Sequence, residues 1–233
     1  MSRIILIETS TALCSTALIE DSRLVSYRES SEPRSQASLT APYVKEMLDG
    51  NGLSVSDCDA VCVSMGPGSY TGLRVGVSTA KGLCFGAGKP LIAVSTLEAL
   101  AWQAISEGLL PQGCDTVIPM IDARRMEVYT AVFKVSGGQV SRQSEIAPVI
   151  VDADSFAQEL AAGPVLFIGD GAGKCADVIK SPNASFHQAC PNAKGLIQPA
   201  LAAMASGRFE DIAYFEPFYL KQFVTTVSKK ALF

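Results

Sequence analysis

The chain has 233 residues, enough for one large or two small domains with an apolar core. Hydrophobic residues make up 48% of it and charged residues only 18%, with a net charge of −4. Because nucleic-acid binding rests on neutralising phosphates, this charge argues against a protein that grips nucleic acid alone. No apolar run approaches the roughly 18 residues that a membrane span requires. The seven cysteines form no CxxC pair, so we expect reduced thiols and a cytoplasmic location.

His187 is the only histidine of the chain. A two-histidine metal site is therefore impossible within it, and a Ser-His-Asp arrangement would have to use this one residue. The stretch around it, residues 181–192, is polar and contains proline and asparagine. This composition favours a solvated loop histidine over a catalytic base.

The first half predicts a β-hairpin followed by alternating helices and strands. The expected elements are strands at residues 4–8, 14–19 and 24–27, a helix at about 39–48, a strand at 60–65, a helix to about 85, a strand at 91–94 and a helix at 97–106. Pro42 should lie in or near the first turn of its helix, because proline deeper in a helix costs about 3 kcal/mol.

A glycine-rich loop, SMGPGSYTGLRVG, connects the strand at 60–65 to the next helix. Gly66, Gly68 and Gly72 would let the backbone approach an anion at the start of that helix, as phosphate-binding loops do. However, their spacing fits neither the dinucleotide fingerprint nor the Walker A loop. The sequence therefore favours a structural turn over a working phosphate site, and leaves both open.

The second half repeats features of the first. ILIETSTALCSTALI and PMIDARRMEVYTAVF each carry an acid after an isoleucine, Glu8 in one and Asp122 in the other, followed eight residues later by Thr-Ala and an aliphatic residue. Farther on, VCVSMGPG has a counterpart in VLFIGDGAG, whose glycines are Gly169 and Gly171. This order predicts an internal duplication, with subdomains at residues 1–107 and 108–233 and the last segment packing back on the first.

Charged residues in these turns have two interpretations each. Glu8 and Asp122 could coordinate Mg²⁺, which prefers carboxylate oxygens, or they could need no ligand. Arg124 and Arg125 could hold an anion, or could only pair with Asp122 or Glu127.

Two helices carry apolar or small residues beside their core-facing positions. One stripe consists of residues spaced four apart on the second helix, which would let another helix approach closely. These residues indicate a helical interface, although close packing on the chain's own sheet explains the small stripe equally well. The six residues are Leu39, Tyr43, Met47, Gly72, Gly76 and Ala80.

Five segments resemble the TsaB family, also called YeaZ, of bacterial threonylcarbamoyladenosine-biosynthesis proteins. They are IETST, GPGSYTGLRVGVSTAKGL, GKPLIAVSTLEALA, DARRMEVY and the closing EPFYLK, which follow the family's order over nearly the whole chain. The resemblance implies an α/β fold of the actin-like ATPase (ribonuclease H-like) class, duplicated in two subdomains. It also implies a non-catalytic subunit rather than an enzyme.

The resemblance implies a function as well. Such a subunit binds and activates the homologous catalytic protein TsaD, together with the ATPase TsaE. The complex places threonylcarbamoyl on the adenosine next to the anticodon of tRNAs that read codons beginning with adenine. In the family, the two helices described above pair with their counterparts in TsaD, or with a second copy when TsaD is absent. We therefore expect a homodimer of the chain alone, tRNA contact only through the complex and no membrane partner.

TsaD carries its metal on a motif with two histidines, and this sequence has Thr96 and Leu100 at the matching positions. Neither side chain replaces imidazole as a ligand, so we expect no metal site. Many family members also carry a histidine where this chain has Gln36, so a role of that histidine is not carried over.

The nucleotide-site loops are then expected to be vestigial, with no tightly bound cofactor and ATP or ADP with Mg²⁺ only in the complex. Their residues are Glu8, Thr9, Ser10, Gly66, Gly68, Asp122, Gly169 and Gly171. The alternative function is an actin-fold ATPase or small-molecule kinase that uses Glu8, Asp122 and the Gly-x-Gly loops.

Overall fold

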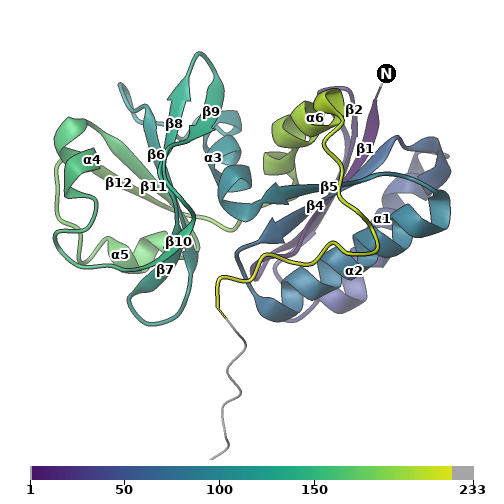
Figure 1. Cartoon of the computed structure of the whole chain (residues 1–233), viewed down its shortest axis with the longest axis horizontal. Helices are drawn as coiled ribbons and strands as arrows, with labels where there is room; N and C mark the ends of the chain where they lie inside the picture. The colour runs from purple at the N-terminus through teal and green to yellow at the C-terminus, as the bar shows by residue number, and fades with distance from the viewer. Residues whose placement is uncertain (1, 222–233) are drawn as a thin grey trace, which may run out of the picture.

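The computed structural model describes residues 2–221, which form two β-sheets with helices packed against them (Figure 1). The elements of the first half are β1 (Arg3–Glu8), β2 (Cys14–Glu20), β3 (Arg23–Ser30), α1 (Gln36–Gly50), a 3₁₀ turn (Val55–Asp57), β4 (Ala60–Gly66), α2 (Tyr70–Ala87), β5 (Leu91–Ser95) and α3 (Thr96–Ser106). Those that follow are β6 (Thr116–Asp122), β7 (Glu127–Thr130), β8 (Phe133–Ser136), β9 (Gln139–Arg142), β10 (Ala147–Ile150), α4 (Ala157–Ala162), β11 (Val165–Gly169), α5 (Ala172–Cys175), β12 (Ala184–Gln188), a second 3₁₀ turn (Ala193–Leu196) and α6 (Ile197–Ser206).

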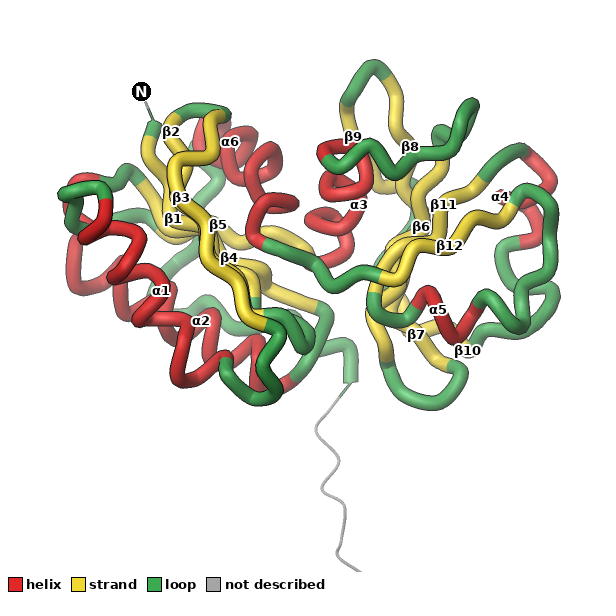
Figure 2. Tube along the Cα trace, turned by 180° about the vertical axis from the view of Figure 1, so that it is seen from behind, coloured by secondary structure: helices red, strands yellow, loops and turns green. Residues whose placement is uncertain are grey.

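The first sheet has the strand order β3-β2-β1-β4-β5, with β1 antiparallel to β2 and parallel to β4. Side chains alternate between the two faces of a strand, and in β1 the side chains on both faces are buried. Ile5 and Ile7 pack with α1 and α2 on one face, whereas Ile4 and Leu6 pack with α6 on the other. Figures 1 and 2 show these helices on opposite sides of the sheet. The continuous apolar sequence of β1 follows from this double covering.

The second sheet repeats this topology. Its main path is β10-β7-β6-β11-β12, with β6 antiparallel to β7 and parallel to β11. The predicted hairpin at the start of the second half is therefore confirmed. One difference is an additional hairpin, β8–β9, whose strand β8 pairs with β6. The strand that corresponds to β3 of the first sheet is β10, and it therefore comes after this hairpin in the chain.

Helix α3 lies between the two halves. Ala99 belongs to the apolar core of the first sheet, whereas Leu100 and Ala104 pack in the core that contains Val117 and Ile168 of the second sheet. The chain then passes from α3 to β6, and the predicted boundary at residues 107 and 108 falls in this connection. The boundary itself stays a prediction.

Two predictions about local structure are wrong. Helix α1 begins at Gln36, so Pro42 lies in its second turn, where it is exposed. Its missing N–H removes one helical hydrogen bond, which the packing of Val44 and Met47 on the sheet offsets. His187 lies in strand β12, opposite Ile168 of β11, and not in a solvated loop. Its ring is half-buried.

The segment after α6, residues 208–221, is called the C-terminal strap. It passes along α2 and toward the second half (Figure 1). The N–H of Glu210 donates to the carbonyl of Leu91 at 2.8 Å, and that of Phe218 donates to the carbonyl of Met65 at 2.8 Å. The Lys81 ammonium donates to the carbonyl of Phe215 at 2.9 Å, so the strap is bonded to both β4 and α2.

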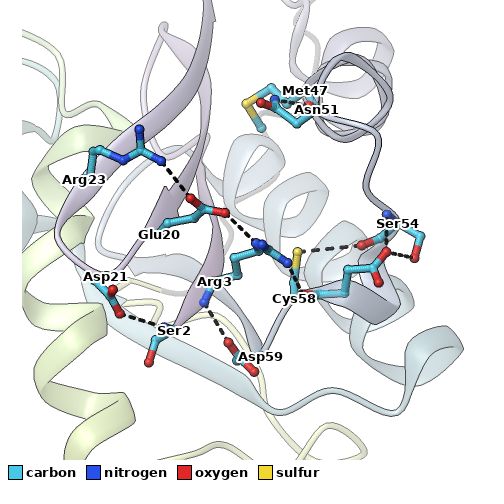
Figure 3. A network of polar contacts seen from close by, with 11 residues as sticks. Ser2, Arg3, Glu20, Asp21, Arg23, Met47, Asn51, Ser54, Cys58 and Asp59 are labelled. Atoms are coloured by element: carbon cyan, nitrogen blue, oxygen red, sulfur yellow. Dashed lines mark hydrogen bonds and ion pairs between the residues drawn. The ribbon is translucent and has the colours of Figure 1, made fainter.

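A polar network lies at the end of the first sheet where β1 starts and β2 ends (Figure 3). Arg3, at the start of β1, donates to Glu20 at the end of β2 at 2.7 Å, and its N–H donates to Asp59 at 2.7 Å. Glu20 also accepts from Arg23 at 2.8 Å, and these arginines hold the pKa of Glu20 below its usual value. This network lies at the strand end away from Glu8. No helix within residues 2–221 is long and apolar enough to cross a membrane.

Candidate functional site

Glu8 ends β1 in a fully buried position. Its Oε1 accepts the N–H of Ser10 at 2.6 Å, and its Oε2 has no hydrogen-bond partner within the described residues. Burial raises the pKa of this carboxyl above its usual value, since the charged form loses its hydration. A buried carboxyl of this kind does not offer Mg²⁺ the hydrated coordination that it prefers.

Asp122 ends β6, at the equivalent place in the second half, but it is exposed. Its Oδ1 accepts the N–H of Arg124 at 2.9 Å and forms an ion pair with Lys174. Its own N–H donates to Asp170 at 2.9 Å. Burial, and then the neighbouring charge of Asp122, raises the pKa of Asp170 to about 6. Sequence reasoning missed Lys174 and Asp170 as partners of Asp122, because they lie far along the chain.

The first glycine loop is filled by the chain itself. The N–H of Ser69 donates to the carbonyl of Ser10 at 2.7 Å. A Cβ at Gly68 would lie 2.4 Å from that carbonyl oxygen, and one at Gly72 would lie 2.1 Å from the carbonyl oxygen of Thr9. The glycines therefore allow α2 to approach the β1–β2 turn. At the start of α2 the N–H of Ser69 is therefore already taken by the carbonyl of Ser10.

The second glycine loop repeats this contact. Gly171 donates its N–H to the carbonyl of Met120 at 2.9 Å. Gly169 has φ +140°, and a Cβ there would lie 2.1 Å from the same oxygen. In each half, a glycine loop after one strand thus closes on the end of the neighbouring first strand.

A cleft of about 1040 Å³ lies between the two halves. The first half contributes the β1–β2 turn, the glycine loop and the segment before α1, and the second half contributes the β6–β7 turn and Asp170. The strap adds residues 218–221. The charged residues that line the cleft are Arg34, Asp122, Arg124, Arg125, Glu127, Asp170 and Lys221.

The predicted small-residue stripe on α2 does not lie outside the core. Gly72, Gly76 and Ala80 are all buried, and a Cβ at Gly76 would lie 2.3 Å from Oγ1 of Thr9 and 3.4 Å from Val63. Met47 on α1 is buried too, and Thr16 of β2 donates to its sulfur at 3.6 Å. These four residues face the chain's own sheet, so placing them on an outward stripe was wrong. Leu39 and Tyr43 are half-buried at the edge of α1.

A different stripe of small residues faces outward on α2. Ser78, Gly82 and Gly86 follow one another at four-residue spacing, and all are exposed. A Cβ at Gly82 or Gly86 would meet nothing within 4 Å. Phe85 lies between them with 84% of its side chain exposed. Helix α1 packs beside α2, so the two helices present one continuous outer face (Figure 2).

Thr96 and Leu100, at which the sequence led us to expect no metal ligand, are part of the core. Oγ1 of Thr96 is 2.7 Å from Oγ of Ser64, and Leu100 is fully buried. The side chain of Gln36 donates to the carbonyls of Thr11 at 2.9 Å and Ala12 at 3.2 Å. Within the part of the chain that the structure describes, no group of three or more His, Cys, Asp or Glu is placed to hold a metal ion.

Two α/β halves of one topology, facing each other across a cleft, define the actin-like ATPase fold. A family profile described as "TsaD: tRNA N6-adenosine threonylcarbamoyltransferase" matches residues 33–214. The protein TsaB of Escherichia coli, described as a tRNA threonylcarbamoyladenosine biosynthesis protein, is 31% identical over 224 residues, which is 94% of each chain. The chain belongs to the TsaB (YeaZ) family.

Solved structures agree with this assignment. YeaZ from Pseudomonas aeruginosa matches with a TM-score of 0.83 at 30% identity, over 94% of this chain and 100% of that one. A second structure from the same organism, described as an uncharacterized protein with similarity to peptidase YEAZ, matches with a TM-score of 0.84 at 31% identity, over 95% and 100%. The similarity therefore covers both halves of the chain.

Proposed function

We propose that this chain is a non-catalytic subunit that binds and activates TsaD, together with TsaE. The complex would transfer threonylcarbamoyl to the adenosine next to the anticodon of tRNAs reading codons that begin with adenine. The name of the Escherichia coli relative, a tRNA threonylcarbamoyladenosine biosynthesis protein, supports this role. The proposal includes a cytoplasmic location and a homodimer when TsaD is absent.

The outer face of α1 and α2 carries the proposal. It combines an exposed apolar side chain, Phe85, with the open stripe at Ser78, Gly82 and Gly86. Small residues let a second helix approach the backbone closely. An exposed aromatic residue can be buried against a partner, and such residues often contribute much of the binding energy. Among the described residues, the helices on the second sheet offer no such face, because α4 and α5 have only 6 and 4 residues. We therefore place TsaD on α1 and α2 of the first half.

The geometry also favours a role without catalysis. The N–H of Ser69 at the start of α2 already donates to Ser10, and Glu8 is fully buried, which disfavours the nucleotide contacts that an ATPase would make at the first loop. Thr96 and Leu100 provide no imidazole for a metal. We propose that ATP or ADP with Mg²⁺ binds only in the assembled complex. The alternative, an actin-fold ATPase or small-molecule kinase, predicts ATP turnover by the isolated chain with Mg²⁺.

Gly82→Leu tests the partner surface. The leucine would project from α2 into open space, so the chain alone should be as stable as the wild type or more stable, since Gly to a good helix former gains up to about 1 kcal/mol. At a helix–helix contact the same side chain overpacks by about 1–3 kcal/mol, which weakens TsaD binding roughly 5- to 150-fold. Calorimetric titration against TsaD measures the loss, and thermal melts measure the stability.

The matched control is Ala202→Leu on α6, which adds a similar volume to an exposed helix position on the opposite side of the sheet. It should bind TsaD like the wild type. Equal affinity of Gly82→Leu, Ala202→Leu and the wild type would show that α2 is not the contact. Steady ATP turnover by the purified chain would instead favour the kinase alternative.

A further inference from the structure

Three arginines line the cleft and have no partner of opposite charge among residues 2–221. Arg34 comes from the segment before α1, and Arg124 and Arg125 come from the β6–β7 turn. Within residues 2–221 none of their guanidinium groups forms an ion pair or a hydrogen bond. We call Arg34, Arg124 and Arg125 the cleft arginines.

The acids nearby are already paired. Asp122 forms an ion pair with Lys174, and Glu127 forms one with Lys221 of the strap. Asp170 accepts the N–H of Asp122. Within residues 2–221 the guanidinium groups of Arg124 and Arg125 thus form no ion pair with Asp122 or Glu127, which decides the alternative that the sequence left open. The cleft arginines therefore bring positive charge to the cleft that no described acid pairs with.

The backbone at these positions is unusual for arginine. The φ angles are +62° at Arg34, +70° at Arg124 and +50° at Arg125, and these are three of only five non-glycine residues with positive φ within residues 2–221. Glycine or asparagine would adopt this conformation more easily. Long cationic side chains at strained positions indicate a use for the side chains themselves.

Aromatic rings lie beside the same cleft. The rings of Tyr70 and Tyr219 are 4.8 Å apart, and the Arg74 guanidinium lies 5.3 Å from the centre of the Tyr70 ring. Tyr219 is 37% exposed and lines the cleft. Arginines that contact phosphates and aromatic rings that stack on bases are the combination by which proteins bind single-stranded RNA.

We propose that the cleft arginines bind the sugar–phosphate backbone of the tRNA anticodon loop, with Tyr219 available to stack on a base. This inference rests on the proposed function. A free nucleotide fits less well, because the N–H of Ser69 at the start of α2, where N–H groups usually hold phosphate, already donates to the carbonyl of Ser10. Cations from loops on both sides of the cleft suit an extended polyanion instead. At physiological salt the net charge of −4 makes this contact too weak for the chain alone, so there it acts in the assembled complex.

The test measures how tightly the complex of this chain with TsaD binds tRNA. The affinity is obtained from the fluorescence anisotropy of labelled tRNA at several salt concentrations. The variant is Arg124→Ala with Arg125→Ala, and a second variant carries glutamine at both positions to keep the side-chain length. The matched control is Arg142→Ala with Arg208→Ala, which removes the same charge at exposed positions outside the cleft. Calorimetry with TsaD establishes first that every variant still forms the complex.

Both cleft variants should bind tRNA about tenfold more weakly than the control. Their slope of log affinity against log salt should fall by roughly 1.4, since each phosphate contact on a single strand contributes about 0.7. Equal affinity and slope for cleft variants and control would overturn the proposal. A complex that binds tRNA like the control but loses ATP affinity would assign the cleft to a free nucleotide instead.

The two proposals fail separately. If neither the wild type nor any variant binds TsaD, the proposed function is refuted before tRNA is added. In that case the chain alone is measured with labelled tRNA at low salt, where charge contacts are strongest. A weaker signal for the cleft variants than for the control would still support the RNA contact, and no difference would reject it.

Discussion

Glu8 and Asp122 form the same local hydrogen bond in the two halves of the molecule. Each ends the first strand of its sheet, and each accepts the backbone N–H two residues later, from Ser10 at 2.6 Å and from Arg124 at 2.9 Å. In both places a glycine loop closes on the adjoining backbone. The two halves therefore share this hydrogen bond as well as the order of their strands. The halves differ in burial, since Glu8 is enclosed and Asp122 faces the cleft.

Gly76→Leu should destabilise the chain itself. The new side chain would enter the space of Thr9 Oγ1 and Val63, where even a Cβ would be too close. Overpacking costs about 1–3 kcal/mol, and each kcal/mol lowers Tm by about 2–4 °C in a chain of this size. Thermal melts of Gly76→Leu and Gly82→Leu, one inward and one outward on the same helix, provide the comparison. A Tm for Gly76→Leu at or above that of Gly82→Leu would contradict this packing.

Gly169→Ala should be among the most destabilising glycine substitutions. It places a Cβ 2.1 Å from the carbonyl oxygen of Met120 at a backbone with φ +140°. Strain and overlap together should cost roughly 3 kcal/mol or more. Gly108→Ala is the control, because Gly108 has φ +67° but open space around it, so its cost should be about 1 kcal/mol. Urea denaturation of both variants measures the difference, and similar midpoints would argue against the close contact.

Asp170 makes stability depend on pH. Its pKa is raised from 3.8 to about 6, so between these values the folded chain holds more protons than the unfolded chain. The contribution of this residue to stability therefore falls as the pH rises through that window. Asp170→Asn, whose side-chain oxygen can still accept the N–H of Asp122, should be more stable than the wild type at about pH 8 and lose this advantage near pH 4. Unfolding by urea at both pH values measures the free energies, and an advantage independent of pH would be inconsistent with a raised pKa.

Lys81→Met should loosen the C-terminal strap. It removes the ammonium that donates to the carbonyls of Ala213 at 3.3 Å and Phe215 at 2.9 Å, while keeping the length of the side chain. The N–H of Phe218, bonded to Met65, should then exchange faster with deuterium, whereas the core strands should not change. Lys45→Met, which breaks only an exposed pair with Asp49, is the control. Unchanged exchange at Phe218 would show that the strap is held without Lys81.

The repeated strand and glycine pattern could be predicted from the sequence because it depends on local chemistry. Alternating faces and apolar runs define strands such as β1 and β6, and glycines mark the places where backbone approaches backbone. The same local logic failed at His187, because a short polar strand at the edge of a sheet resembles a loop. It also failed at Pro42, where packing of α1 on the sheet outweighs the preference of proline for a first turn.

The direction of each stripe on α2 depended on the tertiary structure. Gly72, Gly76 and Ala80 have the same four-residue spacing as Ser78, Gly82 and Gly86, so the sequence cannot tell which stripe faces outward. The β1–β2 turn settles it, since Thr9 lies against Gly72 and Gly76. The partner of Asp122 was decided in the same way, because folding brings Lys174 to it while the left-handed turn directs its neighbours Arg124 and Arg125 into the cleft. The local sequence therefore determined where the strands, helices, acidic turns and glycine loops lie along the chain. Only long-range packing decided which residues each of them contacts.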